Sequence, residues 1–280
     1  MEIFFAPRDT QKYPPCGMFS AGHILALCIT LALVAVGVYL CRNFTKSNLR
    51  VATRIVAVSV TILEGVKIGY NFAYGYTQPD MWLPLAFCSL FIYATFMAGF
   101  GRGIFKRLGE AFLACGCLTA GLAFLLFPTT SLQLHPILHY LCFYSMLFHG
   151  LMMWLSILYI AKGELSFNKR LFTEFFAMVM SFGFLALIVN AVFDCNMMFL
   201  SEPFHMPIAF LNTLHEKSGT LYTLFVLCAY LACYIPSFAV YKLMQAHGAH
   251  DENEFLQSQE ENEAQGALET AATQTNGRTT

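Results

Sequence analysis

Cys88 and a group of histidines are the residues of this 280-residue chain best suited to covalent chemistry. Cys88 stands in the stretch LPLAFCSL, residues 83–90, four residues after Pro84. A thiol attacks an acyl ester as the thiolate, and in apolar surroundings it needs a basic neighbour to form one. Cys88 is therefore a candidate nucleophile, and His139 or His149 is its candidate base. Without such a neighbour, Cys88 is a small residue that packs between helices.

Three histidines and a second cysteine recur at helical spacing. His139, Cys142 and His149 follow His135 by four, seven and fourteen residues. On a helix of about 3.6 residues per turn these offsets return to nearly the same angle, which predicts one inward-facing stripe. Because histidine titrates near neutral pH, such a stripe is suited to proton transfer.

An acid, a base and an amide share one face of another predicted helix. Glu64, Lys67 and Asn71 are spaced so that all three point the same way, and Glu64 and Lys67 can form an ion pair. Ionisable groups inside a membrane-spanning helix are costly and normally face the interior of the bundle. The pair either fixes helix packing or belongs to a functional site.

Together these residues predict a polar cavity within the membrane that opens outward. We expect His139 near the outer surface, His149 near mid-bilayer, and Cys88 roughly 9 Å below the outer start of its helix, at a rise of about 1.5 Å per residue. Asp194 has a second interpretation, as a residue that simply meets water at a helix end. The other predicted cavity residues are His23, Glu64, Lys67, Asn71, Asn190, Asp194 and Asn196.

The elements that must hold these residues are membrane-spanning helices. Hydrophobic residues make up 57% of the chain and charged residues only 12%, and the mean hydropathy is +0.57. A soluble domain has about 25% charged residues, and a spanning helix needs roughly 20 mostly apolar ones. Such apolar runs occupy residues 18–40, 51–74, 82–100, 108–127, 137–160, 171–191 and 220–241. The sequence therefore predicts an all-α, polytopic transmembrane bundle of seven helices.

Positive charges alternate between the connections of these runs. The basic residues are Arg42, Lys46 and Arg50 after the first run, Arg102, Lys106 and Arg107 after the third, and Lys162, Lys169 and Arg170 after the fifth. The positive-inside rule then places the N-terminus outside and the C-terminus in the cytoplasm of a multi-pass protein of the cell membrane. We expect an external segment over residues 1–17, a transmembrane domain over 18–245 and an acidic, disordered cytoplasmic tail over 246–280.

Several functions are not expected from the motifs. The sequence has no P-loop, glycine-rich dinucleotide turn or basic groove, so nucleotide-driven and nucleic-acid functions are not leading hypotheses. Cys115 and Cys117 have no second pair or nearby histidine at zinc-site spacing, so we expect no metal and no cofactor. Cys16 and Cys195, both on the predicted outer side, are a candidate disulfide.

Short motifs in order along the chain resemble a known family. They are FSAGH at 19–23, EGVK at 64–67, LPLAFCSL at 83–90, HYLCFYSMLFHG at 139–150 and NAVFDCN at 190–196. The set is similar to the YwaF-type integral membrane proteins of bacteria, which belong with the eukaryotic transmembrane protein 164 family. The resemblance implies a polytopic bundle, and the eukaryotic relatives are regarded as acyltransferases that remodel ether phospholipids through a cysteine. Cys88 matches the bacterial cysteine, but this chain has Leu85 and Ala86 where the eukaryotic pattern has the nucleophile and a following histidine.

Two functions fit these residues. In the first, Cys88 attacks an acyl ester of a membrane lipid, His149 or His139 activates the thiol, and Glu64 or Asn190 orients that base. In the second, the chain is a proton-coupled transporter or a solute-binding membrane protein. Glu64, Lys67, the histidines of residues 135–149 and Asn190 then bind a small polar solute or relay protons. A third hypothesis is a packing subunit in which these groups only hold the bundle together.

Overall fold

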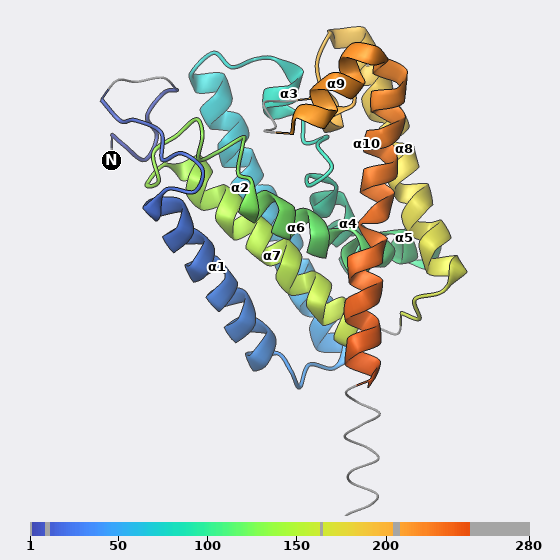
Figure 1. Cartoon of the computed structure of the whole chain (residues 1–280). Helices are drawn as coiled ribbons and strands as arrows, with labels where there is room; N and C mark the ends of the chain where they lie inside the picture. The colour runs from blue at the N-terminus through green and yellow to red at the C-terminus, as the bar shows by residue number, and fades with distance from the viewer. Residues whose placement is uncertain (1, 9–11, 163–164, 204–207, 247–280) are drawn as a thin grey trace, which may run out of the picture. The chain divides into compact units, whose positions relative to one another are not determined.

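The computed structural model describes residues 2–8, 12–162, 165–203 and 208–246, and within these ranges the regular structure is entirely helical (Figure 1). The helices are α1 (Ala21–Leu40), α2 (Lys46–Ala73), α3 (Pro79–Trp82), α4 (Leu90–Phe100), α5 (Gly103–Cys115), α6 (Cys117–Leu126), α7 (Tyr140–Lys162), α8 (Lys169–Phe193), the 3-10 helix η1 (Met197–Phe199), α9 (Ala209–Lys217) and α10 (Gly219–Ala232). Two compact units are distinguished, Met1–Phe238 and Ala239–Thr280. The predicted tail lies almost wholly outside the described residues, which end at 246.

Side-chain caps fix the starts of four long helices. Ser20, Thr45, Asn168 and Ser218 each accept a hydrogen bond from a backbone N–H in the first turn of α1, α2, α8 and α10. Such a cap satisfies an N–H group that has no partner within the helix. The polar residues that separate the apolar runs therefore set where these helices begin.

Four described helices are long and apolar enough to cross a membrane, namely Ala21–Leu40, Tyr140–Lys162, Lys169–Phe193 and the extended run Gly219–Ala246. The pair α5 and α6 makes a fifth if it counts as one bent span. α2 has 28 residues but carries the charged side chains of Glu64 and Lys67, and it is not among the four. The chain is thus a helical membrane protein, and the predicted count of seven spanning helices is not confirmed.

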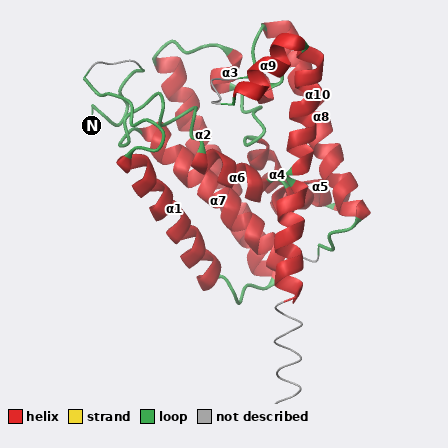
Figure 2. Ribbon diagram, viewed as in Figure 1, coloured by secondary structure: helices red, strands yellow, loops and turns green. Residues whose placement is uncertain are grey.

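The third predicted run is interrupted rather than continuous. Only α3 and α4 are helical there, and residues 83–89 between them form bends and turns (Figure 2). Pro84 has no backbone N–H and disfavours helical geometry in the residue before it, which accounts for the break. Cys88 therefore lies in irregular backbone just before α4. The sequence had predicted it within a continuous helix, and that prediction is wrong.

The fourth predicted run bends by 42° where α5 meets α6 at Gly116. Close contact with α4 also requires a glycine in this region: a Cβ atom at Gly109 would lie 2.6 Å from the Ala94 carbonyl oxygen and 2.7 Å from the Ala98 nitrogen. The backbones of α4 and α5 thus approach more closely than any larger residue allows.

α7 is the central helix of the first unit. It packs against α1, α2, α5 and α6 (Figure 1). In its apolar window 72% of residues are buried, against 17% in α1 and 33% in α8. The outer helices carry exposed apolar side chains such as Leu33 and Phe184, as expected of surfaces that face lipid chains. Polar side chains on α7 therefore face protein, which makes this helix the place to look for a site.

The segment before α1 contacts the ends of α2 and α7 through its backbone. The Ala6 carbonyl accepts hydrogen bonds from Tyr70 Oη at 2.8 Å and from His139 Nε2 at 3.0 Å. The Phe4 carbonyl accepts one from the Tyr140 backbone N–H at 2.8 Å. This segment is an ordered part of the fold over its described residues.

Candidate functional site

The most complete polar network inside the bundle joins α2 to α7. Lys67 Nζ lies 2.7 Å from Glu64 Oε1, which confirms the ion pair expected from their spacing. The hydroxyl of Tyr144 on α7 donates a hydrogen bond to the other carboxylate oxygen, Oε2. The Glu64 side chain is 5% exposed and that of Lys67 is 23% exposed. The carboxylate is therefore buried with both oxygens engaged, and the ammonium group keeps partial access to its surroundings.

His149 lies on α7 just beyond Tyr144. Its Nδ1 is 2.7 Å from the Ser145 carbonyl oxygen, which can only accept, so Nδ1 carries the proton. Nε2 of the neutral ring then holds a lone pair, and it is buried without a hydrogen-bond partner among the described residues. The ring stacks on Phe124 at 3.7 Å between centroids. A buried imidazole with an unengaged basic nitrogen is arranged to accept a proton.

Cys88 lies in the break between α3 and α4, next to a ring that anchors this segment. Phe87 stacks on Tyr230 of α10 at 4.2 Å with an interplanar angle of 3°. Cys88 is partly buried and is a free cysteine. None of the five histidines that the structure describes makes a hydrogen bond to its thiol. Cys88 therefore has no hydrogen-bonded histidine base among the described residues.

The predicted histidine stripe is not a helical stripe. α7 begins at Tyr140, so His135 and His139 precede it, on either side of Pro136, which cannot donate a helical hydrogen bond. The two rings nevertheless stack at 4.1 Å, and the Cys142 thiol donates to the His135 carbonyl at 3.7 Å. Only His149 of the three histidines lies within the helix.

His139 and His23 have both ring nitrogens occupied. His139 Nε2 donates to the Ala6 carbonyl, and its Nδ1 accepts from the Leu141 N–H at 3.1 Å. His23 Nε2 donates to the Leu125 carbonyl at 2.9 Å, and its Nδ1 accepts from the Phe19 N–H at 2.9 Å. Both rings bridge segments that are distant in sequence, which is a structural use of their hydrogen-bonding capacity.

The amide residues likewise bind backbone. Asn190 accepts from the Met197 N–H at 2.6 Å and donates to its carbonyl at 3.1 Å, which closes the turn after α8. Asn196 donates to the Glu202 carbonyl at 2.8 Å. Asn71 donates to the Met81 carbonyl of α3. Asp194 is exposed at the C-terminal end of α8 with a φ of 50°, in agreement with its second interpretation as a residue that meets water.

The structure thus brings together one part of the predicted cavity set. Glu64, Lys67 and Tyr144 form one connected network, and His149 lies five residues beyond Tyr144 on α7, whereas His23, Asn190 and Asn196 belong to local backbone networks elsewhere. Sequence reasoning missed Tyr144. Its spacing of four from Tyr140, whose hydroxyl donates to the Leu63 carbonyl at 2.6 Å, is the signal that marks the α7 face directed at α2.

The predicted disulfide is wrong, because all ten cysteines, each within the described ranges, are free. The Cys16 sulfur lies 3.1 Å from Ser20 Oγ, and the Cys195 thiol donates to the Val189 carbonyl at 3.8 Å. Each thiol therefore has its own local partner.

Comparison with known proteins gives one match. A family model described as the TMEM164 family matches residues 18–242, which cover α1 to α10 and most of the chain. No curated protein and no solved structure matches the chain.

Proposed function

The chain belongs to the TMEM164 family of membrane proteins, and from this premise we propose that it transfers acyl groups between membrane lipids. In this proposal Cys88 carries the acyl group, His149 is the base and the Glu64–Lys67–Tyr144 network forms the polar wall of the site. The observation that supports it most is the buried Nε2 of His149, which has a lone pair and no partner in the described structure. The relationship to YwaF-type bacterial proteins is part of the same proposal.

The reaction proceeds in two balanced halves. His149 Nε2 takes the proton from the Cys88 thiol, and the thiolate attacks the ester carbonyl of a donor lipid. The carbon–oxygen bond of the ester breaks, the proton passes to the leaving alcohol, and a thioester remains on Cys88. The hydroxyl of an acceptor lysolipid then gives its proton to Nε2 and attacks the thioester. The carbon–sulfur bond breaks, and Nε2 returns the proton to the sulfur to restore the thiol.

In this scheme Lys67 stabilises the negative charge that forms on the carbonyl oxygen. A positive charge stabilises the oxyanion that forms when the carbonyl is attacked, and it acts most strongly where water is excluded. Lys67 is held by Glu64 but keeps part of its surface accessible. We propose that it faces the lipid carbonyl, while Tyr144 connects Cys88 to the carboxylate.

The orientation belongs to the proposal as well. With the basic connections in the cytoplasm, the N-terminal segment and the start of α7 lie outside a multi-pass protein of the cell membrane. His139 and Ala6 then lie near the outer surface, Glu64 and His149 lie deeper, and the polar site opens outward. The substrates are lipids that enter from the surrounding leaflet.

A proton-coupled transporter is the second candidate, and one observation favours it. Cys88 makes no hydrogen bond to a histidine in the described residues, whereas Glu64, Lys67 and Tyr144 form a connected network without it. Such a network suits reversible binding of a polar solute. The two candidates therefore differ in whether Cys88 is required.

Lipid profiling of cells that express three variants separates the candidates. We expect Cys88→Ala and His149→Gln to abolish the change in phospholipid acyl chains that the unmodified protein causes, and Cys228→Ala, at an exposed free cysteine, to preserve it. Intact-mass analysis should show a hydroxylamine-sensitive acyl adduct that Cys88→Ala lacks. Acyl transfer is refuted if Cys88→Ala retains full activity, and proton-gradient-dependent solute uptake that needs Glu64 and Lys67 but not Cys88 then supports the transporter.

A further inference from the structure

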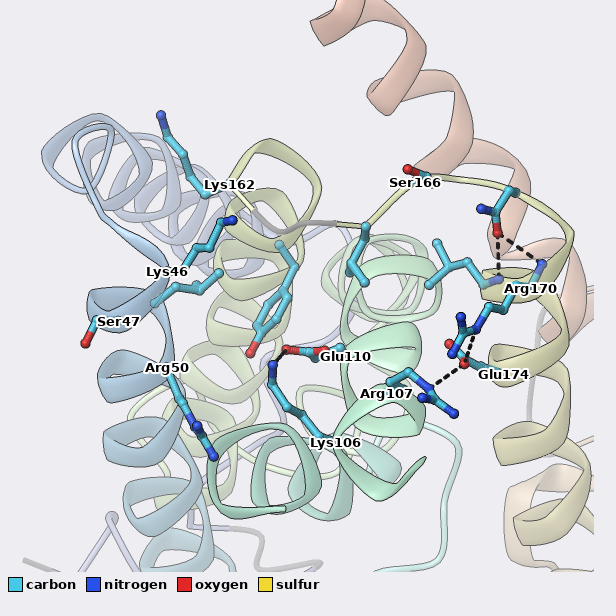
Figure 3. A pocket seen from close by; sticks show the side chains of 15 residues that line it. Lys46, Ser47, Arg50, Lys106, Arg107, Glu110, Lys162, Ser166, Arg170 and Glu174 are labelled. Carbon is cyan, nitrogen blue, oxygen red and sulfur yellow. Dashed lines mark hydrogen bonds and ion pairs between the residues drawn. The ribbon is translucent and has the colours of Figure 1, made fainter. Parts of the chain in front are cut away.

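The three basic connections meet at one pocket. A pocket of about 590 Å³ lies where the start of α2, α5, the end of α7 and the start of α8 come together (Figure 3). Its basic lining residues are Lys46, Arg50, Lys106, Arg107, Lys162 and Arg170. Between connections these residues are 55 to 124 positions apart along the chain. Folding therefore concentrates charge that the sequence distributes over three loops.

Two of the described lining residues are acidic, and they form ion pairs with three of the six basic ones. Lys106 lies 3.3 Å from Glu110, and Arg107 and Arg170 lie 2.8 and 3.2 Å from Glu174. Figure 3 shows these two groups on opposite sides of the pocket. Six basic and two acidic lining residues leave a formal excess of four positive charges. Like charges held this close repel one another unless an anion lies among them.

The pocket also has the backbone features of an anion site. α2 begins at Lys46 and α8 at Lys169, so the positive ends of two long helix dipoles lie at its edge. Arg50 is held in place, because its Nε donates to the Gly99 carbonyl at 3.1 Å and one terminal nitrogen donates to the Gly101 carbonyl at 3.3 Å. A fixed guanidinium group presents its N–H donors in a planar fork that matches the oxygens of a phosphate, and lysine ammonium groups add positive charge.

We infer that this pocket binds a phosphate group. Its volume falls in the range of small-ligand sites, roughly 300–1,000 Å³. The phosphate belongs either to the headgroup of a phospholipid in the adjoining leaflet or to a soluble phosphorylated molecule. The site is separate from the Glu64–Lys67–Tyr144 network, and it does not depend on acyl transfer.

Neighbouring basic residues outside the pocket supply a matched control. Lys106 and Arg170 line it, whereas Arg102 and Lys169, in the same two connections, do not. The double variants Lys106→Gln/Arg170→Gln and Arg102→Gln/Lys169→Gln remove the same charge from the same loops. The single variant Arg170→Gln, at a side chain that is 66% exposed, tests the pocket with little effect on folding.

Binding is measured with the full chain in nanodiscs. Inorganic pyrophosphate is titrated against protein in phosphatidylcholine nanodiscs, and retention of phosphatidic acid is scored by native mass spectrometry in mixed nanodiscs. At least one probe should bind to the unmodified protein. The pocket double variant should lose about tenfold or more in affinity, equivalent to about 1.4 kcal/mol. Arg170→Gln should lose about threefold in affinity, and the affinity of the control double variant should change by less than twofold. Pyrophosphate binding identifies a soluble ligand, and binding of phosphatidic acid alone identifies a headgroup.

Two results overturn the inference. One is that neither probe binds to the unmodified protein. The other is that the pocket and control double variants lose affinity equally, because general surface charge then accounts for the binding.

Discussion

Lys67→Met is the sharpest test of the network between α2 and α7. The substitution removes the ammonium group but keeps a long apolar side chain of similar length. It leaves the Glu64 carboxylate, 5% exposed, with the Tyr144 hydroxyl as its only remaining side-chain partner in the described structure. Breaking a buried ion pair from one side costs about 3–5 kcal/mol, because the remaining charge stays buried without compensation.

Glu64→Gln should cost less than Lys67→Met. The Lys67 side chain is 23% exposed, so its ammonium group stays partly hydrated, and we expect a loss of about 2 kcal/mol. The double variant has no buried charge, and its Gln oxygen still accepts from Tyr144. It should therefore lie within about 1–2 kcal/mol of the unmodified protein, far less than the sum of the two single changes.

Equilibrium unfolding in mixed micelles, followed by fluorescence, gives these free energies. Glu2→Gln is the control, because the Lys12–Glu2 pair has side chains that are 66% and 78% exposed and such pairs contribute about 0–1 kcal/mol. The reasoning is refuted if Lys67→Met changes the free energy of unfolding by no more than the control, or if the double variant is less stable than either single variant.

Two further predictions concern packing and pH. Gly109→Ala should lower the free energy of unfolding by about 2–3 kcal/mol, because the added Cβ meets the backbone of Ala94 and Ala98. Gly65→Ala is the control: Gly65 has open space around it, so the substitution should be neutral or stabilising. Equal effects of the two substitutions would contradict the close approach of α4 and α5. Burial, and next the neighbouring His139, lowers the pKa of His135 to about 3. The folded protein therefore keeps His135 neutral while the unfolded chain takes up a proton below about pH 6.5, and stability should fall by about 1.4 kcal/mol per pH unit as the pH drops from there toward 5. Unfolding measured across that range should show a shallower slope for His135→Phe, and an unchanged slope would refute the assignment.

Much of the helical architecture follows from apolar length alone. The runs that became α1, α7 and α8 were placed within a few residues, because roughly 20 consecutive apolar residues fit one helix and little else. The break at Pro84 was less evident, since the residues around it are as apolar as those of a continuous helix. Hydropathy measures how apolar a segment is, and it does not report where the backbone of that segment departs from a helix.

The candidate site was predictable to the extent that it depended on spacing within one helix. Glu64 and Lys67 pair as their three-residue spacing indicates. His135 and His139 have the spacing of a stripe but lie before the helix, which begins at Tyr140, and Pro136 disfavours helical geometry at His135. Tyr144 depends on which face of α7 meets α2, and that choice is made by packing between helices.

The contacts of the N-terminal segment have a consequence for how this protein can vary. Its hydrogen bonds to Tyr70, His139 and Tyr140 all use backbone carbonyls, those of Phe4 and Ala6. A carbonyl is present whatever the side chain, so most substitutions between positions 4 and 6 leave these bonds in place. An insertion or deletion there shifts every carbonyl by a residue and removes them together. Natural variants should therefore keep the length of this segment, and engineered tags belong before it and not within it.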